Sequence, residues 1–156
     1  MGMDIEEELI SFETAKLAKN KGFFCYCEQF YTDVYGLCIY LDGGEHLSTE
    51  KNGVLYDVNG EFNYGNEYEA PTQSLLAKWL RDHHNILIEI QRCFHFDDYA
   101  NTWLYQAKLP IFDTRQIKET IIVRDKNNNL NFKTYEEALE KSLYDALNLI
   151  EGATTL

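Results

Sequence analysis

Four cysteines are the most reactive side chains of this 156-residue chain, and two of them form a C-x-C pair at Cys25 and Cys27. In an extended strand both thiols would point to one face, because side chains alternate between faces. The spacing differs from the C-x-x-C of zinc knuckles and redox sites. A zinc site built from this pair and a distant histidine is conceivable, but free cysteines usually pack as small buried hydrophobes. We therefore expect no metal and no cofactor.

Other patterns that support catalysis are missing from the sequence. The four histidines have neither the H-E-x-x-H nor the H-x-x-x-H spacing of helical zinc sites. Residues 42–45 are glycine-rich, but they lack the lysine and the following helix of a phosphate-binding loop. The adjacent Asp97 and Asp98 fit a hairpin turn, where aspartate makes local hydrogen bonds. The sequence thus predicts no catalytic residue, which favours a protein that is not an enzyme.

Aromatic side chains are concentrated in the first half of the chain. Five of them follow one another closely: Phe24, Tyr26, Phe30, Tyr31 and Tyr35. Exposed tyrosines favour protein interfaces, because a rigid ring there carries a polar tip. As binding residues these five would contact a protein partner or a second copy of the chain. The same rings would alternatively form the core of an N-terminal sheet, and the sequence leaves both interpretations open.

The chain is strongly acidic, since 26 Asp and Glu against 14 Lys and Arg give a net charge of −12. Residues 1–70 carry 14 acidic and 4 basic side chains, a net charge of −10. This disfavours phosphate binding in general, because proteins that bind nucleic acid neutralise phosphates with Lys and Arg. The acidic half either keeps the protein in solution or forms a face that docks a basic partner. As a nucleic-acid mimic, such a face would inhibit a host DNA-binding protein.

Residues 108–133 depart from this acidic character, because six basic and three acidic side chains give them a net charge of +3. If this stretch binds RNA or DNA, Lys118, Arg124 and Lys126 are the residues expected to contact phosphates. The order of helix, strands and helix over residues 72–150 is loosely similar to a double-stranded-RNA-binding domain, a likeness of fold alone. Nucleic-acid binding is thus a further alternative function.

Hydrophobic periodicity predicts the elements that position these side chains. Helices are expected over residues 4–20, capped by Asp4, over 71–84, and over 134–150, where Thr134 opens a capping box. The expected strands are residues 24–30, 36–41, a hairpin over 54–64 turning at Asn59-Gly60, a second hairpin of 86–96 with 102–109, and 120–124. Pro110 is expected to end the second hairpin, because proline cannot donate to a sheet.

This order predicts an α+β fold, with antiparallel sheets and about three helices packed on one face. One domain over residues 1–156 is expected, since a chain of this length supports a single core. The polar connection at 65–71 is the candidate boundary between an acidic sub-unit, 1–70, and a second sub-unit, 71–156. No apolar run approaches the ~20 residues that cross a bilayer, and none is typical of a signal peptide, so we expect a cytoplasmic protein.

Three segments carry a resemblance to a known family: ISFETAKLA at 10–18, EAPTQSLLAKWLR at 69–81 and YEEAL at 135–139. They resemble a family of small uncharacterised proteins found in phage and prophage regions of gut Bacteroidetes. The resemblance implies a mobile-element origin and a host-cytoplasm setting, and it supplies no catalytic residues. Together with the aromatic half, it leads to the hypothesis of a non-enzymatic accessory protein that acts through protein–protein contacts.

Overall fold

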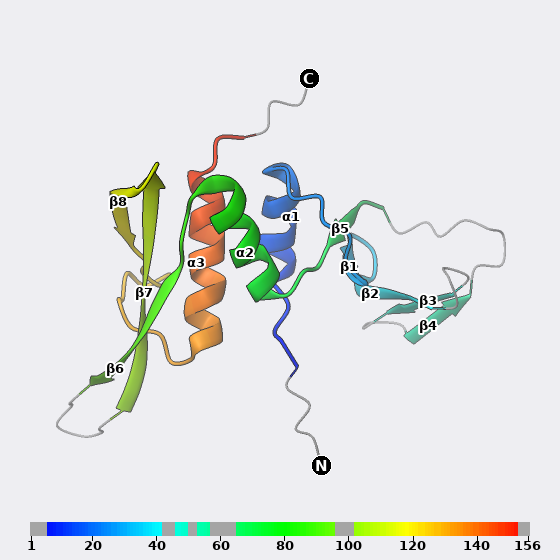
Figure 1. Cartoon of the computed structure of the whole chain (residues 1–156). Helices are drawn as coiled ribbons and strands as arrows, with labels where there is room; N and C mark the ends of the chain where they lie inside the picture. The colour runs from blue at the N-terminus through cyan, green and yellow to red at the C-terminus, as the bar shows by residue number, and fades with distance from the viewer. Residues whose placement is uncertain (1–5, 42–45, 50–52, 57–64, 96–101, 153–156) are drawn as a thin grey trace, which may run out of the picture. The chain divides into compact units, whose positions relative to one another are not determined.

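The chain folds into two compact units, each with its own sheet. The computed structural model describes residues 6–41, 46–49, 53–56, 65–95 and 102–152 (Figure 1). The first unit combines Gln73–Glu151 with residues 6–8, and the second comprises Leu9–Thr72 with Gly152. The division at Thr72 directly follows the polar connection that the sequence indicates at residues 65–71.

Both units combine helices with antiparallel strands, which confirms the predicted α+β class. The helices of the described residues are α1 (Phe12–Asn20), α2 (Gln73–His84) and α3 (Tyr135–Leu149). The first unit holds α2 and α3, and the second holds α1. Each unit therefore packs its own helices, because an amphipathic helix must bury its apolar stripe.

The sheet of the second unit has five antiparallel strands in the order β4-β3-β2-β1-β5. Its strands are β1 (Gln29–Thr32), β2 (Gly36–Leu41), β3 (His46–Thr49), β4 (Gly53–Tyr56) and β5 (Glu67–Glu69). Phe30 of β1 is 1% exposed and packs against Cys38 and Tyr40 of β2. The rings of Phe30 and Tyr40 lie 4.7 Å apart between centroids, which makes this pair the centre of the core.

The strands predicted for this unit agree only in part with the observed ones. The strand at 36–41 is confirmed as β2, whereas the one predicted at 24–30 begins only at Gln29. β5 lies inside residues 65–71, which were predicted to be a polar connection without a strand. Its two glutamates are uncommon in strands, so Tyr68 alone gives a weak local signal, and pairing with β1 is what makes these residues a strand. The predicted Asn59-Gly60 turn lies outside the described residues.

Helix α1 begins at Phe12 and not within the first residues after Asp4, which itself lies outside the described residues. Ser11 is its N-cap, and the Ser11 hydroxyl accepts a hydrogen bond from the N–H of Thr14 at 3.2 Å. Before Ser11 the backbone is extended, since the N–H of Ile10 donates to the carbonyl of Pro71 at 3.1 Å. This long-range backbone pairing overrides the local acidic signal for an earlier helix start.

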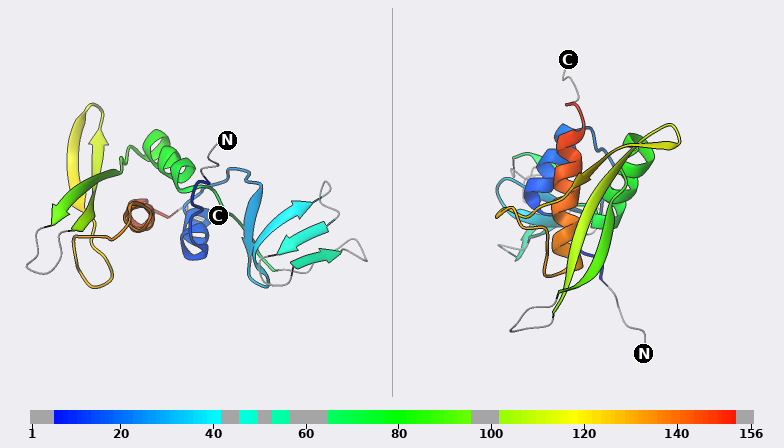
Figure 2. Two further views of the ribbon diagram at one scale, coloured as in Figure 1. Left: turned by 90° about the horizontal axis from the view of Figure 1, so that it is seen from below. Right: turned by 90° about the vertical axis from the view of Figure 1, so that its left-hand side faces the viewer.

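The sheet of the first unit has three antiparallel strands in the order β6-β7-β8. They are β6 (Glu89–His95), β7 (Thr102–Asp113) and β8 (Gln116–Ile122), so the strand predicted at 120–124 starts earlier and ends sooner. Helix α3 lies along one face of this sheet and contacts β7 most (Figure 2). The core between them is formed by small and branched side chains, including Ala107, Leu109, Val123, Leu143, Ala146 and Leu147.

Pro110 does not end its strand, contrary to the prediction. β7 continues through it to Asp113, and Pro110 lies opposite Thr120 of β8. In an antiparallel strand the N–H and C=O of one residue point to the same neighbour. The Pro110 carbonyl accepts from the N–H of Leu87 at 3.0 Å, so its nitrogen also faces that side. The missing N–H therefore removes no hydrogen bond to β8.

Helices α2 and α3 are confirmed close to their predicted positions. The Thr134 hydroxyl accepts from the N–H of Glu137 at 3.1 Å, as the capping box predicts. The Glu137 carboxylate in turn accepts from the N–H of Lys133 at 3.3 Å, one residue before the cap. The first bond satisfies a backbone donor that the helix start leaves without an intrahelical partner, and the second fixes the residue before the cap.

Replacing the cap gives a direct test of this helix start. We expect Thr134→Ala to lower the free energy of unfolding of the first unit by about 1 kcal/mol, because the N–H of Glu137 loses its acceptor. Urea unfolding followed by tryptophan fluorescence reports on this unit, since it contains both tryptophans, Trp79 and Trp103. Thr134→Ser keeps the hydroxyl and should match the wild type. Equal stability of the Ala and Ser variants would contradict the capping role.

Candidate functional site

The segment that follows α1 holds the most exposed rings of the second unit. α1 ends at Asn20, and Gly22 two residues later has a φ of +93°, which favours glycine. The N–H of Phe23 then donates to the carbonyl of Ala18 at 3.0 Å, and the Phe23 ring is buried. In contrast, the side chains of Phe24 and Tyr26 are each 80% exposed. A buried anchor thus holds two aromatic side chains out in solvent.

These rings border a pocket of about 340 Å³ within the second unit. It is lined by Ala15 and Lys19 of α1, by Phe23, Phe24 and Tyr26, and by Glu67 and Glu69 of β5. The two carboxylates are two positions apart on one strand, so both lie on the same face of β5. The pocket therefore combines an aromatic rim with two acidic groups and one basic group.

The carboxylate of Glu69 is the more enclosed of the two. Its Oε2 accepts a hydrogen bond from the backbone N–H of Cys27 at 2.8 Å, which fixes the aromatic segment against β5. Burial raises the pKa of the Glu69 carboxyl; the Cys27 N–H opposes this rise, and the charge of Glu67 adds to it. Glu67 Oε2 accepts from the Tyr40 hydroxyl at 3.4 Å. Both carboxylates are thus held in place by neighbouring donors.

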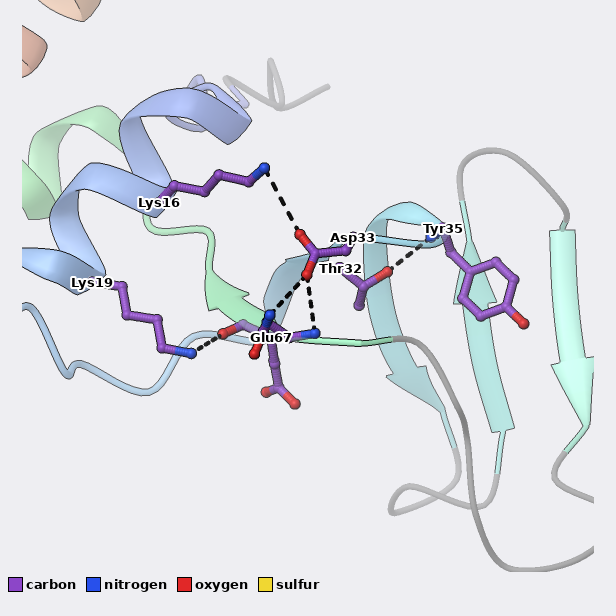
Figure 3. A network of polar contacts seen from close by, with 7 residues as sticks. Lys16, Lys19, Thr32, Asp33, Tyr35 and Glu67 are labelled. Carbon is purple, nitrogen blue, oxygen red and sulfur yellow. Dashed lines mark hydrogen bonds and ion pairs between the residues drawn. The ribbon is translucent and has the colours of Figure 1, made fainter.

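A network of polar contacts connects α1 to the strands (Figure 3). The ammonium of Lys19 donates to the backbone carbonyl of Glu67 at 2.7 Å and lies 4.9 Å from the centroid of the Tyr68 ring. Lys16 lies 3.8 Å from a carboxylate oxygen of Asp33. Side-chain and backbone hydrogen bonds from Asn66 lower the pKa of Asp33, which stays charged at neutral pH. These contacts hold the α1 and β5 walls of the pocket together.

The C-x-C pair does not have the properties of a reactive site. Cys25 is exposed, and the Cys27 thiol donates to the Cys25 carbonyl at 3.4 Å. Burial raises the pKa of Cys27 to about 11, and the negative charge of Glu69 adds to this rise. A nucleophile or a metal ligand needs the thiolate, which so high a pKa disfavours. Among the described residues, no group of three or more His, Cys, Asp and Glu side chains is placed to hold a metal ion.

The five predicted binding aromatics divide between surface and core. Phe24 and Tyr26 are exposed, whereas Phe30 is 1% exposed and packs inside the sheet. The ring of Tyr31 stacks on Phe12 with centroids 5.1 Å apart, and Tyr35 packs against the core around Phe30. The core interpretation therefore holds for Phe30, whereas Phe24 and Tyr26 are exposed because their segment lies outside any strand. Their role in an interface stays a prediction.

Sequence reasoning missed Lys19, Glu67 and Glu69 as residues of this pocket. The signal was weak, since acidic side chains are common in this half of the chain. An E-Y-E pattern with period two would indicate a strand with both carboxylates on one face. The pairing of β5 with β1 fixes both glutamates beside Lys19, although the β5 side chain that contacts α1 is Tyr68, between them.

The predicted nucleic-acid residues all lie in the first unit and are exposed. Lys118 is on β8, and Arg124 and Lys126 follow it in the chain. The Arg124 guanidinium donates to the carbonyl of Asn128 at 3.2 Å, so it is engaged within its own turn. Asp125 lies between Arg124 and Lys126 in the sequence. Hydrogen bonds from Asn129 lower its pKa, so it carries a negative charge at neutral pH. Nucleic-acid binding stays a prediction.

The first unit also exposes an aromatic group that the sequence did not single out. The Trp103 side chain is 51% exposed and packs edge-to-face on Phe94, with ring centroids 4.9 Å apart. The guanidinium carbon of Arg92 lies 4.5 Å from the Trp103 ring centroid, a cation–π contact. Cross-strand pairing of β6 with β7 brings these three side chains together.

Comparison with known proteins adds no relative. No protein-family model matches the chain, and no curated protein or solved structure matches it significantly. Among the described residues, none of the helices combines the length and apolar composition needed to cross a bilayer. The resemblance to phage and prophage proteins stays a prediction, and function is inferred from the side chains themselves.

The thiol chemistry of the pocket edge can be measured. With a pKa of about 11, Cys27 is only about 0.1% thiolate at pH 8, about a hundredfold less than an ordinary thiol. We expect iodoacetamide to modify exposed Cys25 rapidly and Cys27 very slowly, as followed by peptide mass spectrometry. Glu69→Gln should speed the modification of Cys27 and leave Cys25 unchanged, because it removes a nearby negative charge. Equal rates at the two thiols would show that Cys27 is not shielded.

Proposed function

We propose that the protein is a non-enzymatic accessory protein of a phage or mobile element that acts through protein–protein contacts. Its contact surface comprises Phe24 and Tyr26 together with the adjoining pocket. The observation that carries the proposal is the 80% exposure of both rings. Burying a Phe side chain is favourable by about 1.5–3 kcal/mol, so two neighbouring exposed rings provide the free energy for association.

The fixed backbone around the two rings supports this assignment. Phe23 anchors one end of the segment in the core, and the hydrogen bond from Cys27 to Glu69 holds the other. A side chain presented by fixed backbone loses less conformational entropy on binding than one on a freely moving loop. Aromatic residues in such settings dominate the energetics of protein interfaces.

The chemistry of the site favours binding over catalysis. The raised pKa of Cys27 suppresses its thiolate, and Lys19 donates to a backbone carbonyl and faces an aromatic ring. Among the residues that the structure describes, no histidine that could act as a general base near neutral pH lines the pocket. The resemblance of three chain segments to phage and prophage proteins supports the mobile-element origin and the host-cytoplasm setting of the proposal.

The contact is either with a host or phage protein or with a second copy of this chain. Light scattering after size exclusion distinguishes self-association from a monomer, and immobilised protein captures other partners from host lysate. We expect the double variant Phe24→Ser with Tyr26→Ser to lower the affinity for the partner by at least about tenfold, because it loses two aromatic hot-spot residues.

The matched control is Ile117→Ser, which removes an equally apolar side chain, 59% exposed, from the other unit. It should leave association and capture unchanged. A wild-type protein that is strictly monomeric and captures nothing would overturn the proposal. Equal capture by the wild type and the Phe24/Tyr26 double variant would also overturn it.

A further inference from the structure

We propose that the pocket beside Phe24 and Tyr26 binds one basic side chain, an arginine or lysine of the partner protein. This inference rests on the proposed function and names the chemistry of its partner. The aromatic rim contacts the aliphatic stem, and the charged head lies near Glu67 and Glu69. The pocket volume of about 340 Å³ falls at the lower end of the range for ligand sites, about 300–1,000 Å³, which suits a single long side chain.

The charges that line the pocket favour a cation. Glu67 and Glu69 are opposed by one lysine, which leaves a net charge of −1 among the lining side chains. The Lys19 ammonium donates to the backbone carbonyl of Glu67 at 2.7 Å, and its charge also lowers the pKa of the Glu69 carboxyl, so it offsets only part of the acidic charge. The acidic character extends over residues 1–70, whose net charge is −10. Such a field raises the association rate of basic partners.

The rim adds a second attraction for cations. An aromatic face carries a negative electrostatic potential and attracts ammonium and guanidinium groups. The protein already uses this contact in the same unit, where the ammonium of Lys16 lies 4.1 Å from the Phe12 ring centroid. Phe24 and Tyr26 line the pocket with most of their surface exposed, so their rings are accessible to an incoming cation.

The enclosed position of Glu69 gives a further reason for a cationic occupant. Burial raises the pKa of its carboxyl and so destabilises the charged form, while the Cys27 N–H and the charge of Lys19 act in the opposite direction. A guanidinium or ammonium beside it stabilises the charged form. Occupation should therefore lower the pKa of Glu69, and affinity should fall when this carboxylate is protonated at acidic pH.

Small aromatic probes that differ in charge test this chemistry without a known partner. The ¹⁵N-labelled full chain is titrated with benzamidine, benzamide and benzoate at pH 7 and constant ionic strength, and amide shifts are followed. We expect benzamidine, the cation, to shift the amides of Lys19, Phe24, Tyr26, Glu67 and Glu69. Its affinity should exceed that of neutral benzamide by about twofold to fivefold, the contribution of one partly exposed ion pair. Benzoate should bind weakest.

Charge-neutralising variants locate the attraction. Glu67→Gln and Glu69→Gln should each weaken benzamidine binding by about twofold and bring it closer to benzamide. Glu13→Gln is the matched control, because it removes the same charge from an exposed position of α1 outside the pocket lining. It should leave the affinity unchanged. An equal loss in all three variants would assign the effect to net charge and overturn the pocket proposal.

The outcomes separate this inference from the proposed function. Equal or tighter binding of benzoate would overturn the cation pocket and would indicate an anion held by Lys19. If the cation preference is missing while Phe24→Ser/Tyr26→Ser still abolishes capture, the contact surface stands and its pocket chemistry is wrong. If benzamidine binds selectively but the chain associates with no protein, the proposed function fails while the cation site stands.

Discussion

The pairing of β5 with β1 creates the pocket and holds its surroundings. Phe30 of β1 lies opposite Glu69, and Thr32 lies opposite Glu67. Without these backbone hydrogen bonds the three residues of β5 would be an acidic segment with no fixed position. With them, the two carboxylates share the face of Phe30 and Thr32, and Glu69 accepts the N–H of Cys27. The exposed rings then flank the acidic groups because the chain between α1 and β1 is fixed at this point.

The same pairing explains how a strongly acidic half folds stably. Asp33, Glu67 and Glu69 would repel one another if they were brought together without donors. The structure supplies donors from Asn66, Tyr40 and the Cys27 backbone, and it places two lysines of α1 near the carboxylates and the strand backbone. The acidic groups are thus ordered by hydrogen bonds and by the nearby lysines.

The sequence predicted local structure well where local signals agree. Helices α2 and α3 have amphipathic periodicity, and α3 also has its capping box, so side chains within a few residues determine them. Strand β2 follows from its aromatic and branched residues. The prediction was wrong where a distant backbone group decided the outcome. Ile10 pairs with Pro71 and delays the start of α1, and Pro110 stays within β7 because its carbonyl and missing donor face Leu87 rather than β8.

The sequence by itself determined the α+β class, the acidic first half and the presence of an aromatic run. It did not determine which rings of that run are buried, because burial depends on neighbouring strands. Tertiary structure placed Phe30 against β2 and left Phe24 and Tyr26 exposed. It also joined these two rings to carboxylates more than forty positions along the chain, as the bond between Cys27 and Glu69 illustrates. Composition and periodicity describe near neighbours, whereas a binding pocket is formed by residues that only chain pairing brings together.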